Sequence, residues 1–219
     1  MRGRAPLDLS VYLVTDAAQS ADCGRDIATT VREAVAGGVT TVQIRRKESS
    51  ARALLGMTRS IADVLPPHVA LIMNDRVDVA LAALESGIKI DGVHLGQRDM
   101  PLDIARKTVG EGMVIGVSAS TEQQISAACL GGADYIGIGA LRETSSKDDA
   151  PPPLGTSRAC ALARHSSVPT VAIGGVRGDD VSDLRRGGFA GAAVVSWICA
   201  APDPRAAASM LVNVWEAAA

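Results

Sequence analysis

Short apolar runs alternate with amphipathic segments along the whole chain. The apolar runs are rich in β-branched residues and have the length of buried strands. The predicted strands cover residues 11–15, 39–44, 69–73, 92–95, 113–117, 135–138, 170–173 and 192–195. In the segments between them, apolar residues recur with the period of a helix. The predicted helices cover residues 26–36, 50–64, 77–84, 102–109, 122–130, 157–163, 179–186 and 204–216.

This alternation of strands and helices predicts parallel strand pairing with right-handed crossovers. Eight such units close naturally into a (β/α)8 barrel, the TIM-barrel architecture. An open doubly wound sheet is the alternative, but it more often has six strands, and no G-x-G-x-x-G motif opens the first helix. No linker or change of composition divides the chain, so we expect a single barrel domain over residues 1–219.

Composition and charge exclude several classes of protein. Lys and Arg number 22 against 24 Asp and Glu, and there are only five aromatic residues (Trp 2, Tyr 2, Phe 1), which argues against a nucleic-acid partner. No run reaches the ~18 apolar residues of a membrane span, and no secretory signal opens the chain. The four scattered cysteines form no CxxC motif. They indicate neither a disulfide framework nor a zinc site, so we expect a cytoplasmic protein.

Candidate chemistry gathers where the predicted strands end, which is where barrels of this kind place their active sites. Gln43, Arg45 and Lys47 follow one another at alternate positions, so their side chains should face the same way. The planar fork of an arginine beside the point charge of a lysine suits a phosphate or diphosphate. The alternative is that two cations simply solvate a loop.

Two carboxylates follow neighbouring strands. Asn74 and Asp75 end the third strand, and Asp99 ends the loop after the fourth. Either carboxylate could instead cap the helix that follows it. Together they could hold one Mg²⁺, which prefers oxygen ligands, keeps several waters and is often shared with substrate phosphates.

Glycine and hydroxyl residues follow the last two strands. Gly174-Gly175 and Ser196 lie where many barrels bind a phosphate monoester. Glycine lets backbone N–H groups approach the anion closely, although a tight turn alone would also explain the pair. Among the histidines, His94 is expected to support the site, whereas His68 and His165 lie beside helix ends and are expected at the surface.

The chain resembles the thiamine-phosphate synthase (thiamine-phosphate pyrophosphorylase) family over nearly its whole length. The matching phrases are VQIRRK (42–47), IMNDRVDVA (72–80), GVHLGQRD (92–99), IGVSAS (115–120), YIGIGA (135–140), TSSKDDAPPPLG (144–155) and VAIGGV (171–176). The resemblance implies a Mg²⁺-dependent transferase on a (β/α)8 barrel. Its small-molecule substrates would be hydroxymethylpyrimidine diphosphate and a thiazole phosphate, joined with release of diphosphate.

The resemblance also assigns roles to particular residues. Asp75 and Asp99 would ligate Mg²⁺. The residues that would hold the pyrimidine diphosphate are Gln43, Arg45, Lys47, Asn74, Ser118 and Lys147, and among these Arg45, Lys47, Ser118 and Lys147 would serve catalysis. The residues that would hold the thiazole phosphate are Thr144, Ser146, Gly175, Val195 and Ser196.

Three departures from the family pattern stand out: Arg46 replaces an acid, Ser146 replaces a threonine, and 140–142 replace Pro-x-Phe. The last of these changes concerns the thiazole side of the site. Two other functions stay open, a thiazole tautomerase-like isomerase and a non-catalytic binder of thiamine phosphates. The retained Asp75, Asp99 and Lys147 favour the synthase, and the sequence leaves a homo-oligomer open.

Overall fold

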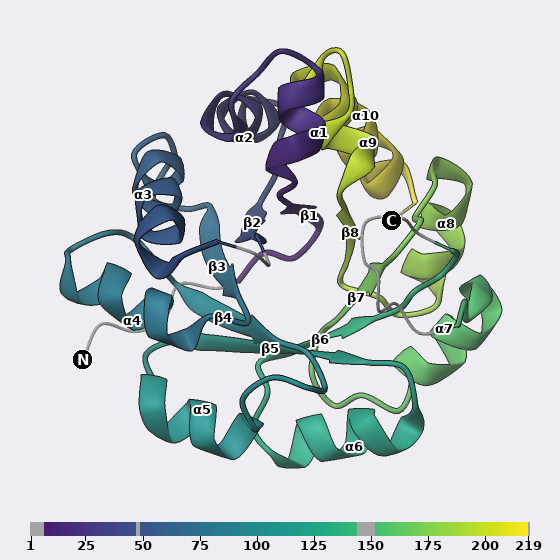
Figure 1. Ribbon diagram of the computed structural model, residues 1–219. Helices are drawn as coiled ribbons and strands as arrows, with labels where there is room; N and C mark the ends of the chain where they lie inside the picture. The colour runs from purple at the N-terminus through teal and green to yellow at the C-terminus, as the bar shows by residue number, and fades with distance from the viewer. Residues whose placement is uncertain (1–6, 47–48, 144–151, 219) are drawn as a thin grey trace.

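The computed structural model describes residues 7–46, 49–143 and 152–218, which form a closed barrel of eight parallel strands surrounded by helices (Figure 1). The strands are β1 (Val11–Val14), β2 (Thr41–Ile44), β3 (Ala70–Asn74), β4 (Gly92–Leu95), β5 (Val114–Ala119), β6 (Tyr135–Ile138), β7 (Thr170–Ile173) and β8 (Gly191–Val194). Each strand pairs with the next, and β1 closes the barrel against β8. The predicted fold class is confirmed.

Eight helices correspond to the predicted ones. They are α2 (Ile27–Ala36), α3 (Ala51–Ala62), α4 (Val77–Glu85), α5 (Leu102–Val109), α6 (Glu122–Leu130), α7 (Gly155–Ala163), α8 (Gly178–Arg186) and α10 (Pro204–Ala217). Three of these helices are followed by a pair of glycines, and the second glycine of each pair has a left-handed backbone. These second glycines are Gly38 (φ 104°), Gly132 (φ 83°) and Gly188 (φ 91°). These turns return the chain to the amino end of the next strand.

Two short helices were not predicted: α1 (Ala17–Asp22) and α9 (Ser196–Cys199). Neither is long enough to show a helical period of apolar residues. Local hydrogen bonds hold α1, because the Asp16 carboxylate accepts from the backbone N–H groups of Ala18 (3.0 Å) and Gln19 (3.1 Å). The two helices meet where the Asp16 N–H donates to Cys199 Sγ, 3.4 Å away.

Both faces of the strands are buried, each by a different partner, and most of the residues on them are apolar. Outward-facing residues such as Leu71 and Ile115 pack against the helices, whereas Tyr12, Ile72 and Tyr135 fill the barrel interior. The interior is tightly packed: a Cβ on Gly116 would lie 2.1 Å from the Tyr135 ring. Continuous apolar runs are typical of such doubly buried parallel strands.

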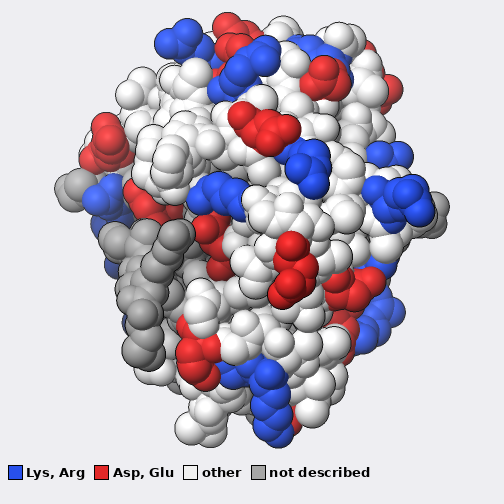
Figure 2. Space-filling model, turned by 90° about the vertical axis from the view of Figure 1, so that its left-hand side faces the viewer, with Lys and Arg blue, Asp and Glu red and all other residues white. Residues whose placement is uncertain are grey.

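The distribution of charged side chains on the surface is consistent with the nearly equal numbers of basic and acidic residues in the sequence. On the face drawn in Figure 2, basic and acidic side chains are interspersed among the described residues. Within the described part of the chain, no helix has the length and apolar character needed to cross a bilayer.

Candidate active site

A cavity of about 750 Å³ opens at the carboxyl end of the barrel. It gathers the described residues that the sequence marked for the site: Gln43, Arg45, Asn74, Asp75, Asp99, Ser118, Gly175, Val195 and Ser196. Four further predicted residues, Lys47, Thr144, Ser146 and Lys147, lie outside the described residues. Strands far apart in the chain meet here because the carboxyl ends of parallel strands all face the same end of a barrel.

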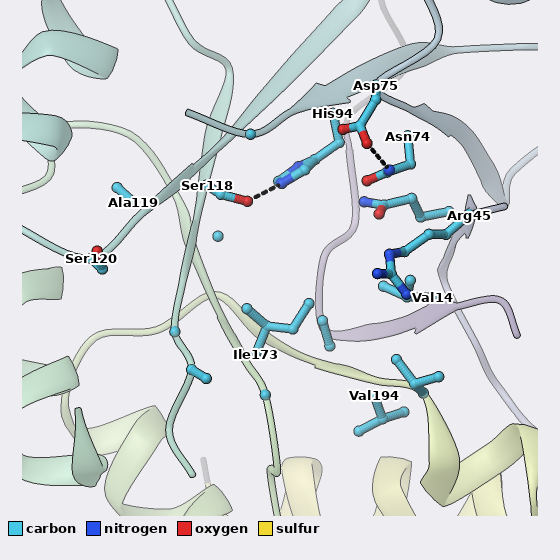
Figure 3. A pocket seen from close by; sticks show the side chains of 18 of the residues that line it. Val14, Arg45, Asn74, Asp75, His94, Ser118, Ala119, Ser120, Ile173 and Val194 are labelled. Atoms are coloured by element: carbon cyan, nitrogen blue, oxygen red, sulfur yellow. Dashed lines mark hydrogen bonds between the residues drawn. The ribbon is translucent and has the colours of Figure 1, made fainter. Parts of the chain in front are cut away.

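The pocket has walls of different character. Figure 3 shows Arg45, Asn74 and Asp75 together on one side, with Ser118 across from them. Apolar side chains from β7 and the end of β8, Ile173, Val194 and Val195, complete the lining. A polar or charged substrate part and a more apolar part can therefore be held side by side.

Gln43 and Arg45 face the same pocket, as their alternate spacing on and after β2 predicts. The Gln43 side chain is buried, and its Nε2 donates to the Tyr12 hydroxyl at 2.8 Å. The backbone N–H of Arg45 donates to Thr15 Oγ1 at 3.0 Å, which fixes the chain as it leaves the strand. The Arg45 side chain therefore extends from a fixed backbone, and its guanidinium reaches the cavity (Figure 3).

Asp75 does not cap the helix that follows it. Helix α4 begins after Arg76 without a side-chain hydrogen bond to its first turn. Asp75 instead adopts a left-handed backbone (φ 60°), and its Oδ2 accepts from Asn74 Nδ2 at 2.6 Å. Its N–H donates to the carbonyl of His94 at 2.9 Å. Left-handed non-glycine residues are uncommon and concentrate at functional sites.

Asp99 does not serve as a helix cap either, because α5 begins after Pro101 without a side-chain hydrogen bond. The Asp99 carboxylate folds back, and its Oδ2 accepts from the backbone N–H of Gly96 at 2.7 Å. A Cβ on Gly96 would lie 2.8 Å from that oxygen, so a glycine suits this position. The capping alternative is therefore wrong for both carboxylates.

The donor set of the pocket fits a magnesium ion better than a transition metal. Asp75 and Asp99 both line the cavity and supply hard oxygen donors. Within the described ranges, no group of three or more His, Cys, Asp and Glu residues could hold a metal. Two carboxylates suffice for Mg²⁺, which takes its other ligands from water and substrate phosphates.

The glycine turn after β7 lies at the apolar wall. Gly174 (φ 87°) and Gly175 (φ 72°) both have a left-handed backbone, as a tight turn requires. Both glycines also line the pocket. Arg142 holds this turn in place, because its Nη1 donates to the Gly175 carbonyl at 2.9 Å. The same guanidinium binds the buried carboxylate of Asp180 through both of its terminal nitrogens.

Asp180 joins the loop after β6 to α8. Its oxygens accept from Arg142, from the Arg177 N–H (2.8 Å) and from Thr156 Oγ1 (3.1 Å). Burial raises the pKa of this carboxyl, but the hydrogen bonds from Arg142, Arg177 and Thr156 together outweigh burial and hold the pKa below its usual value. Arg142 therefore has a structural role, since its guanidinium holds both Asp180 and the glycine turn.

The sequence predicts that His94 supports the site, but it does not identify the two tyrosines beneath the pocket floor. The hydroxyls of Tyr12 and Tyr135 lie 2.7 Å apart inside the barrel, and the ring of His94 bridges Tyr135 to Ser118. One signal was available: both tyrosines of this aromatic-poor chain occupy interior positions of strands. His68 is exposed and His165 is half exposed beside Glu122, as expected.

Comparison with known proteins shows which family this chain is similar to. Residues 11–198 match the sequence model of the thiamine monophosphate synthase family. The thiamine-phosphate synthase of Azorhizobium caulinodans is 42% identical over 212 residues, covering 96% of this chain and 97% of that protein. That of Xanthobacter autotrophicus is 43% identical over 207 residues, covering 94% and 95%.

Solved structures agree with these sequence matches. The thiamine phosphate pyrophosphorylase from Pyrococcus furiosus superposes with a TM-score of 0.85 at 30% identity, covering 97% of this chain and 98% of that one. The orotidine 5'-phosphate decarboxylase from Pyrococcus horikoshii is similar in fold alone, with a TM-score of 0.65 at 14% identity over 94% and 99% of the two chains.

Proposed function

This chain belongs to the thiamine monophosphate synthase family, whose members are transferases of thiamine biosynthesis, and we propose how its pocket performs the reaction. Hydroxymethylpyrimidine diphosphate and a thiazole phosphate bind side by side, and thiamine monophosphate and diphosphate leave. The observation that supports this best is the convergence of Arg45, Asn74, Asp75, Asp99 and Ser118 on one cavity. These are the positions that would receive a diphosphate and its metal.

The reaction needs no nucleophilic side chain. The bond between the pyrimidine methylene carbon and the diphosphate oxygen breaks, and its electron pair leaves with the diphosphate. The electron-rich aminopyrimidine stabilises the resulting cation, and the lone pair of the thiazole nitrogen then forms the new carbon–nitrogen bond. The protein must stabilise charge on the leaving group and orient the two partners.

The polar wall provides the groups for the first task. Arg45 can bind diphosphate oxygens through its planar guanidinium, and Asn74 can donate from its amide. Gln43 and Ser118 lie on the same pocket surface and would contact the pyrimidine. Lys47 and Lys147 are assigned to the diphosphate by sequence resemblance.

Asp75 and Asp99 would hold the magnesium ion. When bound, the ion would supply positive charge to the departing diphosphate. The two carboxylates are fixed for this role by the Asn74 amide and the Gly96 N–H, respectively. Prior ordering of the ligands lowers the cost of assembling the site.

The wall formed by β7 and β8 would hold the thiazole phosphate. Gly175, Val195 and Ser196 line it, and Thr144 and Ser146 join this set by resemblance. The apolar side chains of Ile173 and Val195 would exclude water, which could otherwise capture the pyrimidine cation.

The direct test measures diphosphate release and thiamine monophosphate formation with both substrates and Mg²⁺. We expect Asp75→Asn to lower kcat at least about 100-fold, because the substitution removes one metal-binding charge. Asp103→Asn is the matched control, since Asp103 is 64% exposed on α5 and pairs only with Lys107 among the contacts described.

Three outcomes of this assay would reject the proposal or its assignment. Consumption of thiazole phosphate without diphosphate release would indicate a tautomerase-like isomerase. Tight binding of thiamine phosphates without turnover would indicate a binding protein. Wild-type turnover by Asp75→Asn at saturating Mg²⁺ would remove Asp75 from the metal site.

Other expectations from the sequence stay predictions. They are a single domain over residues 1–219, a cytoplasmic location and the lack of nucleic-acid and membrane partners. The sequence leaves assembly as a homo-oligomer open.

A further inference from the structure

A continuous chain of hydrogen bonds crosses the barrel beneath the pocket. Gln43 Nε2 lies 2.8 Å from the Tyr12 hydroxyl, which lies 2.7 Å from the Tyr135 hydroxyl. The Tyr135 hydroxyl lies 2.9 Å from His94 Nδ1, and His94 Nε2 lies 2.9 Å from Ser118 Oγ. Five strands, β2, β1, β6, β4 and β5, each contribute one member.

The hydrogen-bonded side chains are largely buried, although Gln43 and His94 reach the pocket surface as well as Ser118. The exposed fractions are 4% for Gln43, 2% for Tyr12, 0% for Tyr135 and 8% for His94, whereas Ser118 is only partly buried and faces the pocket. Buried hydrogen-bonding groups in a low-dielectric interior need partners, so their proton arrangement is strongly constrained. Burial also raises the pKa of both tyrosines, which keeps their hydroxyls protonated.

Counting protons along the chain gives it a direction. The Gln43 amide nitrogen can only donate, so the Tyr12 oxygen accepts from it. The buried Tyr12 hydroxyl also needs an acceptor for its own proton, and the Tyr135 oxygen lies 2.7 Å away, so we assign this bond as Tyr12 donating to Tyr135. Tyr135 then has its own proton to donate to His94 Nδ1. When Nδ1 accepts this proton, the ring proton of a neutral imidazole lies on Nε2, facing Ser118.

We propose that this buried chain is a positioning device that holds His94 as the Nε2-protonated tautomer, so that Ser118 Oγ accepts from His94 and turns its own proton into the pocket. Ser118 thereby becomes a hydrogen-bond donor toward an acceptor atom of the bound pyrimidine diphosphate. This use of the chain rests on the proposed function, whereas the tautomer itself is a property of the protein alone. Tyr12, Tyr135 and His94 are positioning residues that act through Ser118.

The packing around the chain supports a fixed geometry. Gly116 leaves the space that the Tyr135 ring occupies, since a Cβ there would lie 2.1 Å from the ring. Gly137 lies behind the imidazole, where a Cβ would approach His94 Cε1 to 3.3 Å. On the pocket side, the Gln97 amide holds the backbone of Ser118 by donating to its carbonyl at 2.6 Å.

The first test reads the tautomer directly in ligand-free protein. Nitrogen-15 NMR distinguishes a protonated from an unprotonated ring nitrogen, and a His68→Gln/His165→Gln double variant leaves His94 as the only histidine. We expect a neutral ring protonated at Nε2 near pH 7.5. A ring protonated at Nδ1, or at both nitrogens, would mean that the chain runs the other way or is broken, and would overturn the proposal. This result does not depend on whether the protein is active.

The second test asks whether Tyr135 acts through Ser118. We expect Tyr135→Phe to lower kcat about 10-fold with little change in KM for the pyrimidine diphosphate, the scale of one misplaced hydrogen bond. Added to Ser118→Ala, it should cause almost no further loss, because residues that act through one contact are not additive. Thr58→Val is the matched control, since Thr58 is a buried hydroxyl on α3 that donates to Leu54.

Each kinetic outcome has a defined meaning once folding is checked by chemical denaturation. Losses that simply multiply in the double variant, or full activity of Tyr135→Phe, would overturn the positioning role. If Tyr135→Phe does not fold, Tyr12→Phe interrupts the same chain one bond earlier and replaces it in the cycle. Inactivity of the wild-type enzyme with both substrates would reject the proposed function but leave the NMR result standing.

Discussion

The ion pair between Arg142 and Asp180 offers the sharpest test of how the site is supported. The Asp180 side chain is 6% exposed and that of Arg142 is 35% exposed. We consider Asp180→Asn, which keeps the shape of the side chain. The substitution removes the charge and places an amide N–H₂ group among donors from Arg142, Arg177 and Thr156.

The expected cost follows from the burial of the pair. Removing one partner of a fully buried ion pair costs about 3–5 kcal/mol, whereas exposed pairs contribute about 0–1 kcal/mol. Because Arg142 is about a third exposed, we expect Asp180→Asn to lower the free energy of unfolding by about 2–3 kcal/mol. For a domain of this size, the melting temperature should fall by about 4–12 °C.

The assay is urea unfolding at neutral pH, followed by circular dichroism. Asp183→Asn is the control on the same helix, because Asp183 is 60% exposed and pairs with Arg186 at the surface. It should change the free energy of unfolding by less than about 0.5 kcal/mol. A loss of unfolding free energy for Asp180→Asn no larger than that for Asp183→Asn would refute the reasoning.

Acid should abolish the difference between wild type and Asp180→Asn. The pKa of Asp180 is lower in the folded protein than in the unfolded chain, where it is about 3.9. Its contribution to stability is therefore fully present above about pH 4 and disappears as the pH falls through the folded-state pKa. A difference that persisted below that range would show that the charge is not its source.

Two further predictions concern packing and thiol chemistry. Gly116→Ala should destabilise the protein by about 1–3 kcal/mol in the same unfolding assay, since the new methyl would overlap the Tyr135 ring, whereas Gly112→Ala has open space and should be nearly neutral. Burial raises the pKa of Cys199 to about 11, so Ellman's reagent at pH 8 should modify the half-buried Cys129 well before Cys199. Equal rates for the two thiols in native protein would contradict the structure at Cys199.

Much of the fold could be predicted because the barrel buries its strands on both faces. Segments such as 135–138 and 170–173 are mostly apolar and are followed by glycine, and the structure confirms both strands. Helix α9 was not predicted because four residues are too few to show a helical period, and its packing against α1, α2 and α10 is visible only in the tertiary structure.

Some features of the candidate site could likewise be predicted from the sequence, whereas others could not. Alternation along β2 placed Gln43 and Arg45 on one face correctly, since that relation is local. Whether Asp75 and Asp99 cap helices or face a ligand could not be settled locally, because both uses suit the same residue types. The left-handed backbone of Asp75 and the turn from Gly96 to Asp99 decided against capping.

The amino-acid sequence by itself determined the alternation of strands and helices, the closed barrel they predict and the residues at its carboxyl rim, because periodicity and strand direction are properties of short segments. Only the tertiary structure decided which side chains meet inside the barrel. Tyr12 and Tyr135 are separated by more than half the chain, yet their hydroxyls form a hydrogen bond inside the barrel. Such contacts depend on strand register and on space left by glycine, which no local pattern encodes.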